Sequence, residues 1–205
     1  EITKRIPVAA TVTGLDVGER EAALQLTHDL DPTDVPLFDR GYPGRRFIGT
    51  LLARGFDLGV RMVVGDGGFP ETQAFWKSGV DSAIIPVDFG EHGVHRMRFV
   101  RRRFAQRRSG RSRNRDKMVI MTTLTRRQGY RIADILDLYR MRWEVETFYR
   151  ELKAEWGIEA FHARTPTGIL QETYAVLTWM TLLAMLENVA DQELTEQRGL
   201  QRWND

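Results

Sequence analysis

The sequence contains no cysteine, so neither a disulfide nor a thiolate metal site is available to it. Carboxylates and four histidines are the remaining candidate metal ligands. No uninterrupted run of about 18 apolar residues is present, and the first residues lack the pattern of a secretory signal. We therefore expect a cytoplasmic protein with no membrane partner. Because the chain starts with Glu1 on a strand-like segment, we also expect a fragment of a longer protein.

Acidic residues are almost missing from one stretch of the chain. Between Arg96 and Lys117 there are ten arginines and one lysine against a single acid, Asp116, although the whole chain has a net charge of only +2. Such a concentration of cations attracts a polyanion and releases its counterions. The stretch predicts nucleic-acid binding, and the alternative is a solvated arginine-rich loop.

Segments typical of strands and helices alternate over residues 1–65. This alternation predicts an α/β layer with partly parallel strands. The predicted strands are 6–14, 35–38 and 56–65, and the predicted helices are 18–30 and 45–55.

The pattern changes over residues 66–130 to short strands separated by Gly and Pro, which predicts an antiparallel β-rich insertion that carries the basic run. The insertion strands are expected at 82–89, 95–100 and 117–124. Two long helical stretches follow in residues 131–205, at about 132–156 and 167–194.

The first of these helical stretches carries a mixed set of polar side chains. An α-helix advances by about 100° per residue, which places Tyr139, Arg142, Glu146, Arg150 and Lys153 within about one quadrant. The apolar residues of the stretch fall on a separate face. One explanation is purely structural, because Glu146 lies four residues from both Arg142 and Arg150, the spacing of surface ion pairs.

The spacing of four of these residues points to a second explanation. Tyr139, Arg142, Glu146 and Lys153 read Y-x2-R-x3-E-x6-K, which resembles the Y-R-E-K signature of DDE transposases of the insertion sequence four family. Two earlier blocks, LFDRGYPG at 37–44 and FDLGVRM at 56–62, resemble the family's second aspartate strand and the strand that follows it.

The resemblance implies an α/β, ribonuclease-H-like catalytic fold with the inserted β-rich subdomain and C-terminal helices. Asp39 and Glu146 would be two catalytic acids and metal ligands, holding Mg²⁺ or Mn²⁺, with two ions in the complete enzyme. Tyr139, Arg142 and Lys153 would bind DNA phosphates. Arg150 joins this DNA-binding group on helix geometry alone.

The implied partner is double-stranded DNA, namely the terminal inverted repeats of the element and its target DNA. A homodimer in a DNA complex and a bacterial, nucleoid-associated location are further expectations. One departure is that the family's first aspartate has no equivalent, since Asp16 lies in a turn only 23 residues before Asp39. We therefore expect a fold that is incomplete at its N-terminus, and a chain that is inactive alone.

Several other polar and aromatic residues have structural explanations. Asp66, Asp81 and Asp88 are expected to form turns, and the histidines have no mutual ligand spacing. Trp76 is expected in the core rather than stacked on a flipped base, and for Tyr42 turn packing and substrate contact are both open.

Three functions fit these patterns. The first is cut-and-paste DNA transposition, by metal-dependent cleavage and strand transfer at insertion-sequence ends. The second is a non-catalytic DNA-binding remnant or domesticated derivative, and the third is a related two-metal nuclease. The Tyr139-to-Lys153 signature favours the first over the third.

Overall fold

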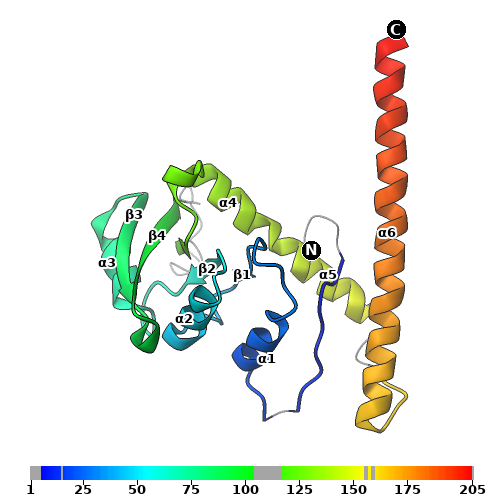
Figure 1. The fold of residues 1–205 in the computed structure, drawn as a ribbon, viewed down its shortest axis with the longest axis horizontal. Coiled ribbons are helices and arrows are strands. Elements are labelled where there is room, and N and C mark those ends of the chain that lie inside the picture. The colour runs from blue at the N-terminus through cyan, green and yellow to red at the C-terminus, as the bar shows by residue number, and fades with distance from the viewer. Residues whose placement is uncertain (1–5, 15, 104–116, 155–156, 158–159, 205) are drawn as a thin grey trace, which may run out of the picture. The chain divides into compact units, whose positions relative to one another are not determined.

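The computed structural model describes residues 6–14, 16–103, 117–154, 157 and 160–204 (Figure 1). The chain folds as two compact units. We call Leu15–Arg140 the sheet unit, and Glu1–Gly14 with Met141–Asp205 the helical unit. The elements in chain order are α1 (Glu19–Leu26), β1 (Leu37–Phe38), α2 (Arg45–Ala53), β2 (Gly59–Met62), α3 (Pro70–Ser78), β3 (Ser82–Asp88), η1 (Gly90–His92), β4 (Val94–Arg103), β5 (Lys117–Thr122), η2 (Arg126–Gln128), α4 (Ile132–Met141), α5 (Trp143–Ala154) and α6 (Pro166–Asn204).

One mixed sheet of five strands organises the sheet unit, in the order β1-β2-β5-β4-β3. β1 and β2 are parallel, as the strand and helix alternation predicts, and the other neighbours are antiparallel. The mixed α/β class is therefore confirmed. Because β5 pairs with β2, the strands of segment 66–130 extend the same sheet as the strands of the first segment.

The two edge strands of the sheet differ in length and chemistry. β1 has two residues, and among the described strands its only neighbour is β2. β3 has seven residues and contains Pro86, which has no backbone N–H to offer a further strand.

Both faces of the sheet are covered, and β5 shows this best. Its side chains alternate between two apolar cores: Val119 and Met121 join the first, and Met118 and Ile120 join the second. A strand buried on both faces needs apolar residues at successive positions, which explains the run MVIM. Complete burial of one such side chain stabilises the fold by about 1.5–3 kcal/mol.

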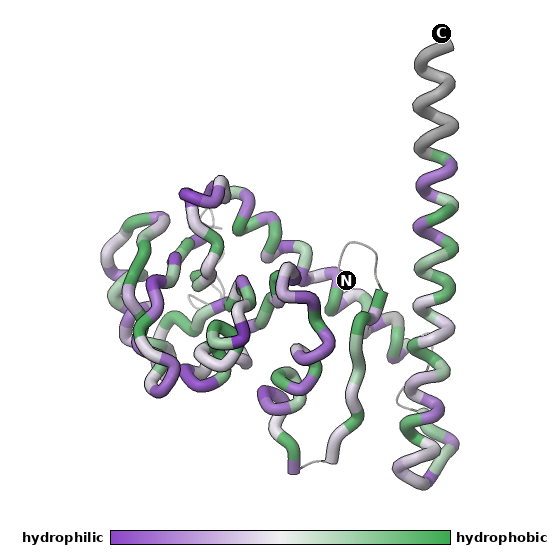
Figure 2. Tube along the Cα trace, viewed as in Figure 1, coloured by the Kyte–Doolittle hydropathy of each residue, from purple (hydrophilic) through white to green (hydrophobic). Residues whose placement is uncertain are grey.

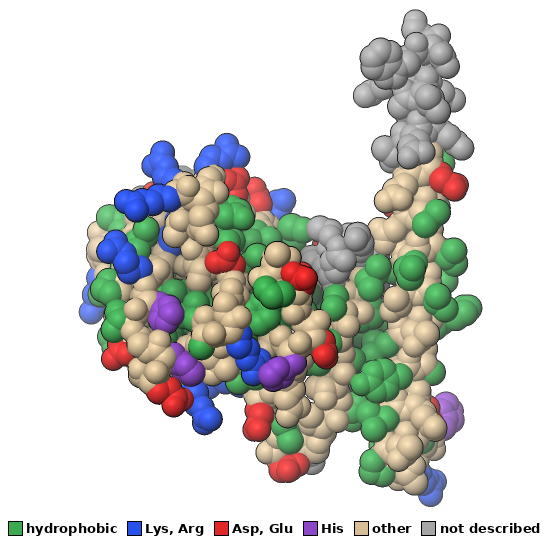
Figure 3. All heavy atoms as spheres, viewed as in Figure 1, with side chains coloured by type: hydrophobic (Ala, Val, Ile, Leu, Met, Phe, Trp, Pro, Cys, Tyr) green, Lys and Arg blue, Asp and Glu red, His purple; other side chains and the backbone are tan. Residues whose placement is uncertain are grey.

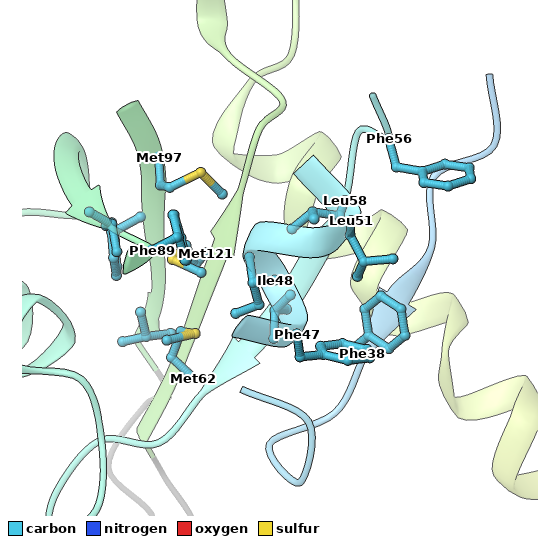
Figure 4. Packing of buried hydrophobic residues seen from close by; sticks show 14 of the residues in the cluster. Phe38, Phe47, Ile48, Leu51, Phe56, Leu58, Met62, Phe89, Met97 and Met121 are labelled. Carbon is cyan, nitrogen blue, oxygen red and sulfur yellow. The ribbon is translucent and has the colours of Figure 1, made fainter. Parts of the chain in front are cut away.

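The first core lies between the sheet and helices α2 and α3. Helix α2 contributes Phe47, Ile48 and Leu51, and α3 contributes Phe75. Figure 4 shows the α2 side chains packed among residues from the strands. Phe47, Ile48 and Leu51 form the buried stripe of α2, and Gly55 follows the helix with a positive φ of 86°, a conformation that glycine adopts readily after a helix end.

The second core lies on the opposite face of the sheet, under α4. Ile135 and Tyr139 of α4 are buried against Val100 of β4 and against the second-core side chains of β5. The sheet unit therefore has three layers, with α2 and α3 on one side, the sheet in the middle and α4 on the other.

Helix α3 is absent from the sequence prediction, which assigned only strands and turns to 66–130. Its start and end carry the usual signals, with Pro70 at the first turn, Glu71 beside it and Gly79 in the left-handed conformation at the C-cap. The sequence analysis missed these helix-end signals because the glycine-rich segment around Asp66 favours turns.

The strand predicted at 6–14 is wrong, because the described residues there belong to no strand. In the helical unit they run along α6, where the Tyr174 hydroxyl donates to the carbonyl of Ala10 at 3.1 Å. Val- and Thr-rich composition favours a strand only where a neighbouring strand can pair with it.

The single helix predicted over 132–156 is also wrong, since α4 ends at Met141 and α5 begins at Trp143. Arg142 lies in the turn between them, and the Val145 N–H donates to its carbonyl at 3.0 Å. The bond joins residues three apart, which is tighter than the four-residue bond of an α-helix.

Helix α6 is long and unusually apolar on its surface. Among the described helices, only its stretch Pro166–Leu194 is long and apolar enough to cross a membrane by length and composition, and 17% of the most apolar window is buried. Figure 2 shows hydrophobic residues recurring along it. The sequence analysis predicted a helix at 167–194 but no membrane-length apolar stretch, because polar residues such as Thr178 and Thr181 interrupt the apolar run. The expectation of no membrane partner stays a prediction.

Candidate active site

Asp39 lies at the carboxyl end of β1, directly after the buried Phe38. The Phe38 ring packs against Phe47 and Tyr42, with ring centres 4.9 and 5.4 Å away, and this fixes the end of the strand. The Tyr42 N–H then donates to the Asp39 carbonyl at 3.0 Å and closes the turn. The sequence thus holds Asp39 between a buried strand and a tight turn, where its carboxylate has a defined position.

Two side chains contact the Asp39 carboxylate inside the sheet unit. The Tyr139 hydroxyl of α4 donates to its Oδ1 at 3.2 Å, and Nη1 of Arg61 lies 3.6 Å from the same oxygen. Parallel pairing of Phe38 with Val60 explains why Arg61 of β2 is the neighbour of Asp39. The Asp39 side chain remains 36% exposed, so a ligand can still reach the carboxylate.

The helix geometry predicted that Tyr139 lies on an exposed polar face, and this prediction is wrong. It is 3% exposed in the second core, and its hydroxyl also lies 3.4 Å from the Phe38 carbonyl. The prediction treated α4 and α5 as one helix and kept the aromatic ring apart from the apolar residues. The ring instead packs with those residues, and only its hydroxyl reaches Asp39.

Glu146 lies in the first turn of α5, in the helical unit. Its Oε1 accepts a hydrogen bond from Nη2 of Arg142 at 2.6 Å. The Arg142 side chain is 11% exposed and that of Glu146 is 41% exposed. The pair is therefore more than a solvated surface ion pair: a largely buried guanidinium fixes a carboxylate that solvent still reaches.

Lys153 and Arg150 are exposed on the same helix as Glu146. Their exposure leaves both cations accessible to a large anionic ligand. Of the five residues that the helix geometry grouped, α5 carries Glu146, Arg150 and Lys153, while Arg142 precedes it and Tyr139 belongs to α4.

The candidate metal ligands do not form a complete site. Over the described ranges, no three His, Cys, Asp or Glu side chains come together in a group that could hold a metal ion. Asp16 lies exposed in a turn before α1 and belongs to no such group. The histidines of the described residues belong to no such group either.

The basic run is only partly described, because residues 104–116 lie outside the described residues. Its described part is not a uniform cationic surface. Arg98 is buried, and Arg101 pairs with Asp81 at 3.2 Å. Sequence composition could not separate these two arginines from their exposed neighbour Arg102.

Other residues behave mostly as turn or core residues. Oδ1 of Asp88 accepts a hydrogen bond from the Gly90 N–H at 2.9 Å, as expected of a turn former. Trp76 packs against the first core, and the cationic groups of Arg101 and Lys117 lie 5.6 and 5.9 Å from its ring centre. The Tyr42 hydroxyl donates to Glu19 at 2.6 Å.

Comparison with known proteins gives one match. A family model described as the transposase DDE domain matches residues 3–182, which is well over half of the chain. No curated protein matches the sequence, and no solved structure matches it either. The matched region includes Asp39 and the whole motif from Tyr139 to Lys153.

Proposed function

Because the chain belongs to the transposase DDE domain family, we propose that it acts in cut-and-paste transposition of an insertion sequence of the insertion sequence four type. Family membership implies a polynucleotidyl transferase that binds DNA and generally uses a divalent metal. The observation that carries the proposal is the Asp39 carboxylate, held by Tyr139 of the Y-R-E-K motif at the carboxyl end of β1.

Asp39 and Glu146 are the proposed metal ligands. Their oxygens suit a hard cation such as Mg²⁺ or Mn²⁺, and both carboxylates keep surface that a cation can reach. When bound, two such ions supply activation of the attacking water or 3′-hydroxyl and stabilisation of the departing oxygen.

The surrounding side chains orient the acids and bind the substrate. Tyr139 and Arg61 fix the rotamer of Asp39, and Arg142 fixes that of Glu146. The burial of Tyr139 opposes the direct phosphate contact expected of it, so we assign it to positioning. Arg150 and Lys153 are proposed to bind DNA phosphates, the arginine through paired N–H groups and the lysine as a point charge. Arg142 was expected to bind phosphate as well, but its burial and its hydrogen bond to Glu146 assign it to positioning.

A third carboxylate is needed to complete the site. We infer that the first catalytic aspartate of a ribonuclease-H-like fold lies on a segment outside this sequence and that the chain alone does not cleave DNA. A second candidate function, a DNA-binding remnant or domesticated derivative, is favoured by the lack of a three-ligand group among the described residues.

A test of DNA nicking by an extended chain distinguishes the transposase from the DNA-binding remnant. The chain is extended with the upstream reading frame, and Mg²⁺-dependent nicking is measured on duplexes that carry the ends of the encoding element. We expect nicking by the extended chain and none by its Asp39→Asn variant, with Asp66→Asn, an exposed acid in a turn, as the matched control. Absence of nicking by the extended, folded chain would support the binding remnant instead.

A further inference from the structure

A basic pocket lies on the sheet unit between β3, β4 and the start of α4. It has a volume of about 600 Å³, and three arginines line it: Arg98 of β4, Arg126 of η2 and Arg131 just before α4. Ser82 of β3 completes its polar wall. Figure 3 shows Lys and Arg side chains gathered over this part of the sheet unit.

Arg98 is the unusual member of the group, because it is 4% exposed. Its Nε donates to the Ser82 hydroxyl at 3.1 Å, and its Nη1 donates to the Tyr130 and Leu124 carbonyls at 2.8 and 3.4 Å. Among the described residues Nη2 has no hydrogen-bond partner, and no carboxylate forms an ion pair with the guanidinium. Carbonyls fix the guanidinium geometrically but leave its charge unneutralised.

The charges around Arg98 do not balance. Burial lowers the pKa of Arg98, and the positive charge of Arg126 lowers it further, whereas Asp134 acts in the opposite direction. Asp134 is itself engaged, because it accepts hydrogen bonds from Nε and Nη2 of Arg131 at 3.2 and 3.0 Å. Arg98 thus feels the positive charge of Arg126, while Asp134, the carboxylate that acts on it, is hydrogen-bonded to Arg131; an anion in the pocket would relieve the excess positive charge.

We propose that this pocket binds a phosphodiester group of the DNA backbone, which rests on the proposed function. Arginine suits a phosphate because its N–H groups can donate in pairs to two oxygens. Tyr139 lies seven residues beyond Ile132, about 10 Å further along α4.

The test compares two neighbouring arginines of η2. Arg126 lines the pocket, whereas Arg127 is exposed beside it and does not. Binding of the full chain to a fluorescent DNA duplex is measured by anisotropy over a range of salt concentrations. Arg126→Ala is expected to weaken DNA binding about 10-fold. It should also reduce the slope of the logarithm of the binding constant against the logarithm of the salt concentration by about one, which corresponds to one lost phosphate contact, whereas Arg127→Ala should change neither quantity much. Both side chains are exposed, so both variants are expected to fold.

Equal losses from the two variants would overturn the proposal and leave an ordinary charged surface. Inorganic phosphate serves as a second probe, followed by the NMR signal of the Arg98 Nε–H. If millimolar phosphate shifts this signal and the duplex does not, the pocket is a small-anion site and the DNA assignment is wrong. Asp39→Asn in the extended chain tests the proposed function separately, because loss of nicking there does not depend on Arg126.

Discussion

Tyr139 and Asp39, which lie 100 positions apart in the sequence, are joined by a hydrogen bond of 3.2 Å from the tyrosine hydroxyl to Oδ1. The bond links the first residue of the Y-R-E-K motif to the acid at the end of β1. The Tyr139 ring is buried in the second core between α4 and the sheet, and from there its hydroxyl reaches the end of β1.

Replacing Tyr139 by Phe tests whether this bond positions the acid. The variant loses one hydrogen bond, worth about 0.5–1.5 kcal/mol of stability, and keeps the ring in the core. In the extended chain we expect the Mg²⁺ concentration for half-maximal nicking to rise about 10-fold, as when other indirect partners of a metal ligand are lost. Tyr149→Phe, at an exposed residue of α5, is the matched control. An unchanged Mg²⁺ requirement would assign Tyr139 to packing alone.

Replacing Glu146 by Gln tests the second proposed ligand. Glutamine keeps an oxygen that can accept from Arg142, so the local fold is preserved while the carboxylate charge is lost. Nicking by the extended chain should fall by more than about 100-fold, because loss of a direct ligand exceeds the effect of losing an indirect one. DNA affinity, measured without metal, should stay within about threefold. Glu144→Gln, exposed on the same helix, should leave nicking unchanged.

Acid should remove a contribution of Asp134 to stability. Hydrogen bonds from the Arg131 side chain and then from its backbone N–H hold the pKa of Asp134 below the ordinary value of 3.8. A lowered folded-state pKa means that the contribution is fully present above the unfolded pKa and disappears as the pH falls through the folded one. The difference in Tm between the chain and Asp134→Asn should therefore be constant from pH 5 to 7 and shrink as the pH falls below 3.8 and through the lowered folded-state pKa. A difference that persists there would point to a cause other than charge.

Phe99 should be among the most sensitive positions of the sheet unit. Its side chain is completely buried in the first core, 5.6 Å from the ring centre of Phe75. Phe99→Ala should lower the free energy of unfolding by about 3–5 kcal/mol in urea titration. Val94→Ala at the exposed start of the same strand should change it by less than about 0.5 kcal/mol. Equal effects would mean that β4 does not bury its central residues.

The periodic parts of the fold were predictable from sequence. The α2 stripe follows a period that a single helix imposes, and β1 and β2 are apolar runs that end at turn residues. The absence of a strand among the described residues 6–14 and the pairing of β5 with β2 depend on which segments meet in space, and local composition does not specify this.

For the candidate site, the sequence predicted which residues take part but not their local geometry or burial. Asp39 and Glu146 were found through spacing and resemblance, but the helix geometry assumed continuity through Arg142, where the chain forms a turn. The burial of Tyr139 depends on the sheet beneath it, and the sequence of α4 alone does not reveal it. Arg98 likewise cannot be told from Arg96 or Arg102 without the β3 and α4 neighbours that enclose it.

The two edges of the sheet differ in whether a further strand can pair with them. Pro86 denies a backbone donor to any strand that approaches beside β3, whereas β1 carries no proline and has β2 as its sole neighbour among the described strands. A further strand, from whatever polypeptide, is therefore admitted beside β1 and discouraged beside β3. Such a strand would run next to the residue that precedes Asp39, so whatever side chain it carried there would become a neighbour of that acid.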